Sequence, residues 1–424
     1  MEDNREKIVV KGGRELKGEV NISSAKNSIL PIIAATILCP EPITINNTPM
    51  LEDVEVICKL LNELNCDINI SSITNKLTIN TKNITTVDAN AELIRKMRAS
   101  FLIMGPMLAR FGYCKLSLPG GCNIGSRPID LHLKGFKALG ADIIKGHGFV
   151  QVKGKKLIGN RIYLDFPSVG ATENIIMASV LAEGTTIIEN AAEEPEIWDL
   201  ANFLNKMGAK IEGAGLGKIT ITGVKTLKGI KYTPIYDRIE AGTFMIAAAI
   251  TNSRIKINGV NEEHLRSLIE KLKEAGVVFD QYSNNSIIVD GKKEKNPLDI
   301  KTLPYPGFPT DMQAQMMSLL SIIKGVSIVT ETVFENRFMH VAELQRMGAN
   351  IKIDGRTAII EGVVKLTGCQ VKATDLRAGA AMILGGLVAE GETKINDVYH
   401  IDRGYVNIEE KFRKLGAEIY RIDE

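Results

Sequence analysis

The sequence is poor in the residues on which several common protein classes depend. Its 424 residues include only five histidines and one tryptophan, and aromatic residues make up 5% of the chain. The cysteines show no paired spacing for zinc and are too few for a disulfide scaffold in a chain of this length. The six cysteines are Cys39, Cys58, Cys66, Cys114, Cys122 and Cys369, and most of them are therefore expected to be small buried residues.

Cofactor motifs are absent as well. The chain has no Walker loop, no GxGxxG that opens a helix after a strand, and no metal-ligand cluster among its scattered histidines. Nucleotide hydrolysis, hydride transfer and zinc chemistry therefore lack their required parts. The sequence predicts an activity that uses neither a metal nor another cofactor.

Charge and hydropathy argue against two classes of partner. A net charge of +2 does not favour nucleic acid as the main partner. The longest apolar stretches, 29–38 and 101–108, are too short to cross a bilayer, and the polar residues 1–13 do not resemble a signal peptide. The expectation is a cytoplasmic protein of two or three domains that acts on small molecules, with no nucleic-acid or membrane partner. Its oligomeric state stays open.

What the sequence has in abundance is internal repetition. Six segments, about 70 residues apart, end a helix and turn into a strand in the same way. In five of them a glycine stands where a helix C-cap needs a left-handed residue, and Asn65 takes that place in the first. The segments are LNELNCDINI from Leu61, FKALGADIIK from Phe136, LNKMGAKIEG from Leu204, LKEAGVVFDQ from Leu272, LQRMGANIKI from Leu344 and FRKLGAEIYR from Phe412.

Upstream of each segment the sequence predicts a second helix, followed by a short strand. These helices are apolar nearly all round and rich in Ala, Gly and Ser, which predicts that they are buried and closely packed. Six such units in a chain that is not a solenoid predict an α/β fold of two domains with three units each, sheets outside and buried helices inside. The helices are expected over 23–38, 98–111, 171–184, 240–252, 310–325 and 375–391.

Charged residues stand at the N-terminal ends of these apolar helices. Buried charges are costly unless the first helical turns open on a cleft filled by water or a ligand, so the functional site is predicted where the helix starts converge. Taken singly, each cation is as easily explained as a solvated or ion-paired surface group. Together they would form a cationic pocket for a phosphorylated or carboxylated substrate: Lys26, Arg98, Arg127, Arg377 and Arg403.

The segment 115–140, KLSLPGGCNIGSRPIDLHLKGFKALG, holds the candidate reactive group. A short strand ends at Pro119, and Cys122 follows in a glycine-rich loop, five residues before Arg127 and just before a predicted helix that starts near Pro128. A buried, inert thiol is the common fate of cysteine. The neighbouring glycines and Arg127 instead favour an accessible thiolate.

Three further residues have two interpretations each. Asp311, in FPTDMQAQ, is either a site carboxylate or an N-cap of the helix that follows Pro309. His132 and His400 lie near candidate site residues, and for both a structural role is the preferred interpretation.

Seven motifs span the chain from end to end: SSAKNSILP, MRASFLIMGP, LPGGCNIGSRPIDLH, FPTDMQAQ, ENRFMH, ATDLRA and HIDRGY. In this order and spacing the sequence resembles the family of enolpyruvyl transferases that act on UDP-N-acetylglucosamine. The resemblance implies a two-domain inside-out α/β barrel built from six βαβαββ-type units, in agreement with the repeats. It also implies a discontinuous domain, 1–23 with 236–424, and a continuous domain, 24–235, that carries the Cys122 loop.

The resemblance further implies a reaction. The enolpyruvyl group of phosphoenolpyruvate would pass to the sugar 3-hydroxyl by addition and elimination, with release of phosphate, in the first committed step of peptidoglycan precursor synthesis. Cys122 matches a proton donor that forms a covalent adduct with phosphoenolpyruvate and is attacked by the epoxide fosfomycin. Asp311 matches the base and a contact to the sugar nucleotide. Lys26, Arg127 and Arg403 match residues around phosphoenolpyruvate, with Arg98 and Arg377 in support.

For the uridine nucleotide, the family pattern falls on ten residues in four segments. One neighbouring position departs from it, because some members carry a lysine two residues before Ser168 and this chain has Phe166. The matching residues are Asn27, Arg127, Pro128, Ile129, Asp130, Leu131, Ser168, Val169, Gly170 and Val333.

Two alternatives stand beside this hypothesis. The sister enzyme that uses shikimate 3-phosphate has the same fold and donor but lacks the GGC loop, and the RPIDLH segment suits a uridine nucleotide. The other alternative is a non-catalytic paralogue that binds a sugar nucleotide or a partner protein. Such a protein would have no need for Cys122, Lys26, Asp311 and Arg403 together.

Overall fold

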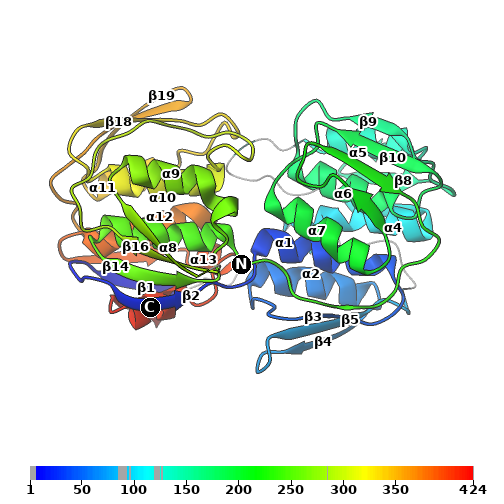
Figure 1. Cartoon of the computed structure of the whole chain (residues 1–424), viewed down its shortest axis with the longest axis horizontal. Coiled ribbons are helices and arrows are strands. Elements are labelled where there is room, and N and C mark those ends of the chain that lie inside the picture. The colour runs from blue at the N-terminus through cyan, green and yellow to red at the C-terminus, as the bar shows by residue number, and fades with distance from the viewer. Residues whose placement is uncertain are drawn as a thin grey trace. The chain divides into compact units, whose positions relative to one another are not determined.

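The computed structural model describes residues 6–84, 93–94, 97–118, 125, 128–283 and 285–423, with the backbone alone at 98 and 281–283. Contacts between Cα atoms divide the chain into two compact units (Figure 1). Unit 1 comprises the residues up to Ser23 together with those from Tyr236 onward. Unit 2 runs from Ser24 to Ile235, except that the described residue Gly125 groups with unit 1.

The described part of unit 1 contains three four-stranded mixed sheets, ordered β21-β22-β1-β23, β15-β16-β14-β2 and β17-β18-β20-β19. Each has one parallel pair, such as β14 with β2, and its other pairs are antiparallel. The strands are β1 Glu6–Lys11, β2 Lys17–Asn21, β14 Arg254–Asn258, β15 Val278–Ser283, β16 Ser286–Asp290, β17 Ile300–Lys301, β18 Val326–Thr330, β19 Asn350–Asp354, β20 Thr357–Glu361, β21 Gln370–Lys372, β22 Glu392–Asn396 and β23 Glu418–Asp423.

The described part of unit 2 also contains three sheets, ordered β11-β12-β10-β9, β13-β3-β5-β4 and β6-β8-β7. Alternating side chains give the strands one buried face, as in β5, where Leu77 and Ile79 are buried. The strands are β3 Ile43–Ile45, β4 Asp67–Ser71, β5 Lys76–Asn80, β6 Tyr113–Ser117, β7 Asp142–Gly146, β8 Phe149–Lys153, β9 Arg161–Tyr163, β10 Thr185–Glu189, β11 Lys210–Glu212, β12 Lys218–Thr222 and β13 Lys231–Tyr232.

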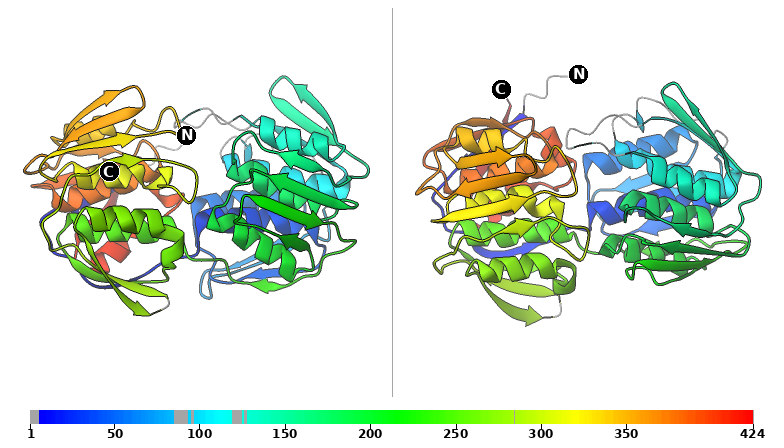
Figure 2. Two further views of the ribbon diagram at one scale, coloured as in Figure 1. Left: turned by 45° about the horizontal axis from the view of Figure 1, so that its top comes forward. Right: turned by 90° about the horizontal axis from the view of Figure 1, so that it is seen from above.

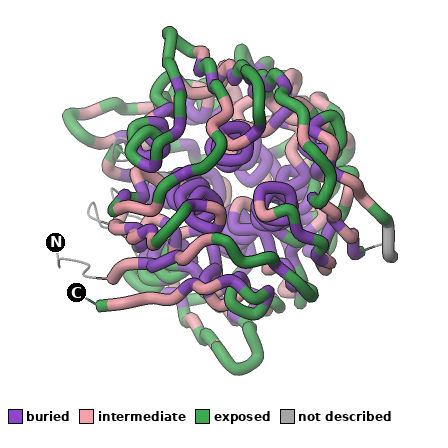
Figure 3. Tube along the Cα trace, turned by 90° about the vertical axis from the view of Figure 1, so that its left-hand side faces the viewer, coloured by how far each residue is buried: buried purple, intermediate pink, exposed green. Residues whose placement is uncertain are grey.

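The apolar helices predicted from the sequence are the buried helices of the two units. In unit 1, α8, α10 and α12 pack side by side, and each also contacts a different sheet (Figure 2). All thirteen residues of α8 are buried, and Figure 3 shows buried helical coils ringed by exposed segments. The helices, with the short 3₁₀ helices that adjoin them, are α1 Lys26–Ala35, η1 Thr36–Leu38, η2 Arg98–Ile103, α4 Met104–Phe111, α6 Val169–Ser179, α8 Arg238–Ile250, η4 Thr310–Met312, α10 Gln313–Leu320 and α12 Leu376–Val388.

The predicted helix ends are confirmed in all six repeats. A left-handed residue stands two positions after the last residue of each amphipathic helix: Asn65, Gly140, Gly208, Gly276, Gly348 and Gly416. The next N–H bonds to the carbonyl five residues earlier, as from Ala141 to Phe136, and a strand begins one residue later. These helices are α2 Glu52–Glu63, α5 Asp130–Ala138, α7 Pro195–Lys206, α9 Arg266–Glu274, α11 Val341–Arg346 and α14 Ile408–Lys414.

Two further short helices in unit 1 are η3 Glu262–Leu265 and α13 Tyr399–Asp402. Within the residues that the structure describes, no helix has both the length and the apolar character needed to cross a membrane.

Candidate active site

Asp311 lies between two buried arginines of unit 1. Arg337 Nη2 donates to Asp311 Oδ1 at 2.9 Å, and Arg377 donates to Oδ2 from Nη2 at 2.9 Å and from Nε at 3.2 Å. The arginine side chains are only 4% and 3% exposed, whereas that of Asp311 is 27% exposed. Each arginine also has a buried Nη1 with no hydrogen-bond partner among the described residues. An anionic ligand would satisfy such donors.

The two guanidinium groups determine the protonation state of Asp311. Burial alone would raise the pKa of this carboxyl, but the charges of Arg377 and Arg337 outweigh burial and hold the pKa well below its usual range. Asp311 is therefore ionised at neutral pH. In this arrangement it is a weak base, so accepting a proton requires an arginine to turn from the carboxylate toward a bound ligand.

Local structure excludes the alternative that Asp311 is a helix cap. Asp311 lies inside η4, where Pro309 occupies the N-cap position and no side chain bonds to a backbone N–H. Gln315 donates to the Asp311 carbonyl at 2.9 Å and thereby fixes this turn. Capping is instead the role of Asp375, which accepts from the backbone N–H groups of Arg377 and Ala378 at the start of α12.

Arg377 is further held by an aromatic ring. Its guanidinium carbon lies 5.6 Å from the centroid of the Tyr405 ring, and the Tyr405 hydroxyl is 2.9 Å from Thr243 Oγ1 in α8. Arg403, two residues before Tyr405, follows the end of α13, which packs against α12. The structure thus brings the predicted residues Asp311, Arg377 and Arg403 to neighbouring elements of unit 1.

Lys26 begins the buried helix α1 of unit 2. A cation is unfavourable in the first turn of a helix, and Lys26 is offset by an ion pair of 2.7 Å from its Nζ to Oδ2 of Asp53 in α2. The two side chains are 11% and 4% exposed. Asn27 follows Lys26 on the same helix and is partly buried. Lys26 is therefore ion-paired, as one alternative had it, but it is buried and not a solvated surface group.

Two of the predicted uridine-site segments are neighbours in unit 2, at the starts of the contacting helices α5 and α6. Pro128 and Ile129 precede α5, and Asp130 and Leu131 form its first turn. Ser168 caps α6, accepting from Ala171 N at 3.4 Å, and Val169 and Gly170 follow it. A Cβ on Gly170 would lie 3.2 Å from the His132 ring, so glycine permits this close approach.

His132 itself is buried, and its Nδ1 lies 3.0 Å from Asn174 Nδ2 of α6. This position between two packed helices confirms its predicted structural role. His400 is partly buried, and its ring lies over that of Tyr399, with 4.1 Å between the centroids.

Three predicted groups cannot be placed. Cys122 and Arg127 lie outside the described residues, and the Arg98 side chain does so too, although its backbone begins η2. Among the residues that are described, no group of three or more His, Cys, Asp or Glu could hold a metal ion.

Sequence analysis missed Arg337 and Asp53 as members of the site. Arg337 belongs to the ENRFMH motif, which was its only signal. Asp53 stands in the first turn of α2, where an acidic residue is favoured for helix stability alone, so its sequence position does not distinguish it.

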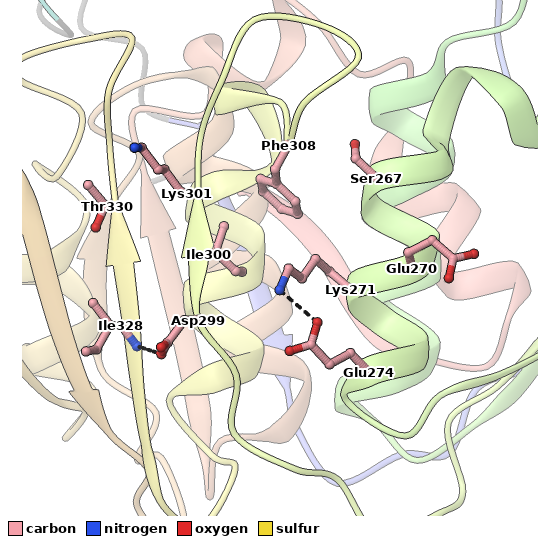
Figure 4. A pocket seen from close by; sticks show the side chains of 10 residues that line it. All are labelled: Ser267, Glu270, Lys271, Glu274, Asp299, Ile300, Lys301, Phe308, Ile328 and Thr330. Carbon is pink, nitrogen blue, oxygen red and sulfur yellow. Dashed lines mark hydrogen bonds and ion pairs between the residues drawn. The ribbon is translucent and has the colours of Figure 1, made fainter.

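A surface cavity of about 540 Å³ in unit 1 contains none of the predicted site residues (Figure 4). It is lined by the apolar side chains of Ile300, Phe308 and Ile328 and by charged side chains from α9 and the β17 segment, including the paired Lys271 and Glu274. The mixed charge around this cavity does not suit an anionic substrate.

His340 supplies a test of the buried region next to Arg337. It is 1% exposed and its Nε2 lacks a partner among the described residues. Burial lowers its pKa to about 4 and outweighs the opposing effect of the Asp375 carboxylate. As the pH falls through 6.5, the unfolded chain takes up a proton on this histidine and the folded chain does not. The free energy of unfolding therefore has its full value above pH 6.5 and decreases as the pH drops toward 4.

Between pH 7.5 and pH 5, we expect the free energy of unfolding of the parent to fall by about 2 kcal/mol more than that of His340→Asn. Urea unfolding at both pH values measures this difference, and the change at pH 7.5 serves as the control for altered packing. Equal losses of stability in the two proteins would contradict the assignment of a neutral His340.

Comparison with known proteins gives a consistent result along the whole chain. Residues 10–412 match the family described as EPSP synthase (3-phosphoshikimate 1-carboxyvinyltransferase). UDP-N-acetylglucosamine 1-carboxyvinyltransferase 2 of Clostridium tetani is 67% identical over 416 residues, covering 98% of this chain and 100% of the relative. UDP-N-acetylglucosamine 1-carboxyvinyltransferase 1 of Staphylococcus aureus is 53% identical over 421 residues, covering 99% and 100%.

Solved structures agree in fold. The enolpyruvyl transferase NikO from Streptomyces tendae matches with a TM-score of 0.89 and 23% identity, over 99% of both chains. An EPSP synthase from Acinetobacter baumannii matches with a TM-score of 0.77 and 17% identity, over 98% of this chain and all of the other. The α/β fold with mixed sheets is therefore that of the enolpyruvyl transferases.

Proposed function

Because the chain belongs to the UDP-N-acetylglucosamine 1-carboxyvinyltransferase branch of the EPSP synthase family, we propose that it transfers an enolpyruvyl group from phosphoenolpyruvate to UDP-N-acetylglucosamine. The reaction begins peptidoglycan precursor synthesis and thus cell-wall construction. Identity of 53–67% over full-length relatives favours this acceptor over shikimate 3-phosphate. The observation that carries the chemistry is the partly exposed Asp311 carboxylate held by the buried Arg337 and Arg377.

The reaction sets clear requirements. The sugar 3-hydroxyl oxygen attacks C2 of phosphoenolpyruvate while C3 takes a proton, which gives a tetrahedral ketal. Phosphate then leaves, and loss of a proton from the new methyl group restores the double bond. This sequence needs a base for the hydroxyl, a proton donor near C3, and fixed cations around the phosphate and carboxylate groups.

The chain has residues for each requirement. Asp311 serves as the base and contacts the sugar nucleotide, and the Cys122 thiol donates the proton to C3, forms the covalent adduct with phosphoenolpyruvate and is the target of fosfomycin. The cations around phosphoenolpyruvate are Lys26, Arg127 and Arg403, with Arg98 and Arg377 in support. The ion pairs of Lys26 and Arg377 support this assignment, because buried cations with fixed partners need little reorganisation when charge develops.

The uridine nucleotide binds across the starts of α5 and α6, at Pro128–Leu131 and Ser168–Gly170, and also contacts Asn27, Arg127 and Val333. The neighbouring helix starts support this assignment, because exposed backbone N–H groups there favour an anionic diphosphate. No cofactor takes part.

The two units correspond to the two domains of an inside-out α/β barrel with six βαβαββ-type repeats. The domains are 1–23 with 236–424, and 24–235. The six equivalent helix ends and the shared strand pattern of the sheets support this arrangement. The enzyme works in the cytoplasm, where both small-molecule substrates occur, and needs neither nucleic acid nor a membrane.

Phosphate release tests the function. With phosphoenolpyruvate and UDP-N-acetylglucosamine, the purified protein is expected to release phosphate and to give a sugar nucleotide heavier by one enolpyruvyl group. Release with shikimate 3-phosphate alone would assign the protein to the sister reaction. No release with either acceptor, despite calorimetric binding of the sugar nucleotide, would make it a binding protein.

A further inference from the structure

Glu331 is a buried carboxylate that follows β18 in unit 1. It is only 1% exposed, although it is the first residue of a loop, Glu331-Thr332-Val333, that begins with two polar residues. A buried carboxylate is costly unless hydrogen bonds satisfy it. The partners of Glu331 therefore show what it does for the fold.

Four donors converge on this side chain. Its Oε1 accepts from Thr302 Oγ1 at 2.8 Å, from Val333 N at 2.8 Å and from Phe334 N at 3.2 Å. Its Oε2 accepts from Thr310 Oγ1 at 2.8 Å. Three of the four donors therefore share Oε1, and Thr310 alone holds Oε2.

The four donors belong to three separate segments. Thr302 follows β17, Thr310 comes directly before Asp311, and the Val333–Phe334 backbone leads to Arg337. Thr332 also donates two hydrogen bonds to Thr302, from its backbone N–H to Oγ1 at 2.9 Å and from its Oγ1 to the carbonyl at 2.6 Å. One side chain thus joins the turn of Asp311 to the loop that carries Val333.

We infer that Glu331 is a positioning residue for catalysis, which holds Asp311 and the Val333 loop in register for the sugar nucleotide. This inference rests on the proposed function. Oε2 acts through Thr310 on the base, and Oε1 acts through the backbone of residues 333–334 on the nucleotide contact. Glu331 does not itself touch the reacting atoms.

The two oxygens predict which substitutions are tolerated. In Glu331→Gln the amide oxygen keeps the three donors of Oε1, and the amide NH₂ can donate to Thr310 Oγ1, since a hydroxyl also accepts. Glu331→Ala removes all four bonds. A displacement of about 1 Å at a reacting group lowers the rate by about 100-fold.

The experiment measures kcat and both KM values by phosphate release, and the Kd of UDP-N-acetylglucosamine by calorimetry. Glu331→Ala is expected to lower kcat/KM for the sugar nucleotide by about 100-fold and to raise its Kd. Glu331→Gln is expected to stay within about tenfold of the parent. Thr310→Val, which removes only the Oε2 bond, is expected to lower kcat while the Kd changes little.

Asp299 provides the matched control. Its Oδ1 accepts from the backbone N–H of Ile328 at 3.0 Å, so it also links the segments of β17 and β18 (Figure 4). The two strands are parallel, and Asp299 precedes β17 whereas Glu331 follows β18, so the two links lie at opposite ends of the pair. Asp299→Ala is expected to leave kcat, KM and Kd unchanged.

Two results would overturn the inference. One is a Glu331→Ala protein that is less stable to urea yet keeps kcat and the KM and Kd of the sugar nucleotide within twofold, because Glu331 would then be structural only. The other is an Asp299→Ala protein with the same losses as Glu331→Ala. If the proposed function itself were wrong, the parent protein would release no phosphate with UDP-N-acetylglucosamine, which is a different result from either of these two.

Discussion

Replacing Asp311 with asparagine is expected to lower kcat by about 10²- to 10⁴-fold, the usual contribution of a positioned general base. Asparagine has nearly the same shape and keeps an oxygen for one arginine, but it cannot take the hydroxyl proton. Phosphate release with both substrates saturating measures the effect. A kcat within tenfold of the parent would show that another group is the base.

The same substitution is expected to destabilise the protein, so a loss of activity must be separated from a loss of folding. Asp311→Asn leaves Arg337 and Arg377 without their shared counter-charge, and loss of one partner from a buried ion pair costs about 3–5 kcal/mol. Urea unfolding shows whether the inactive variant is still folded under assay conditions. Bound substrates would offset part of this loss, because their anionic groups replace the carboxylate beside the arginines.

The low pKa of Asp311 also predicts a feature of the parent enzyme. The ionised carboxylate stabilises the folded chain fully above the pKa of the unfolded chain, and this contribution is lost progressively as the pH falls from there toward the far lower folded pKa. The acidic side of the kcat/KM profile, which reports the free enzyme, should therefore show no protonation of Asp311.

Replacing Lys26 with methionine is expected to lower kcat/KM for phosphoenolpyruvate by about 10²- to 10³-fold, the effect of removing a group that stabilises developing charge. Methionine fills a similar volume, so the change mainly removes the cation. In this variant the Asp53 carboxylate, which is only 4% exposed, loses the lysine that neutralises it. The free energy of unfolding is therefore expected to fall by about 3 kcal/mol.

A second substitution separates the two effects. In Lys26→Met with Asp53→Asn the buried charge is removed and stability should return, whereas turnover should stay low because the cation is still missing. Recovery of turnover in the double variant would contradict the assignment, since Lys26 would then serve only to neutralise Asp53. Thermal unfolding and phosphate release on the same three proteins give both answers.

The repeats could be predicted from sequence because their signals are local. Each repeat has a left-handed residue after its amphipathic helix and an apolar helix upstream, and both signals depend on neighbouring residues only. The left-handed residues were confirmed, for example at Asn65 and Gly140, and so were the apolar helices. Helix bounds differ by a few residues, since the first turn at 310–312 is a 3₁₀ helix that precedes α10.

The site was predicted less completely because its contacts join distant residues. Asp311 lies 26 residues from Arg337 and 66 from Arg377, so whether its carboxylate caps a helix or pairs with two cations depends on tertiary structure. Glu331 gives no sequence signal, because the hydroxyls that make its burial tolerable belong to residues 29 and 21 positions away.

The central position of β1 in its sheet has a consequence for synthesis on the ribosome. This strand pairs with β22 on one side and β23 on the other, so Val10 lies opposite both Thr393 and Ile419. At about 5–20 residues per second, the ribosome needs roughly 20–80 s to translate from β1 to β22. During that time β1 has no native neighbour, while unit 2 has emerged in full. Unit 1 therefore closes this sheet only after β22 and β23 have been translated.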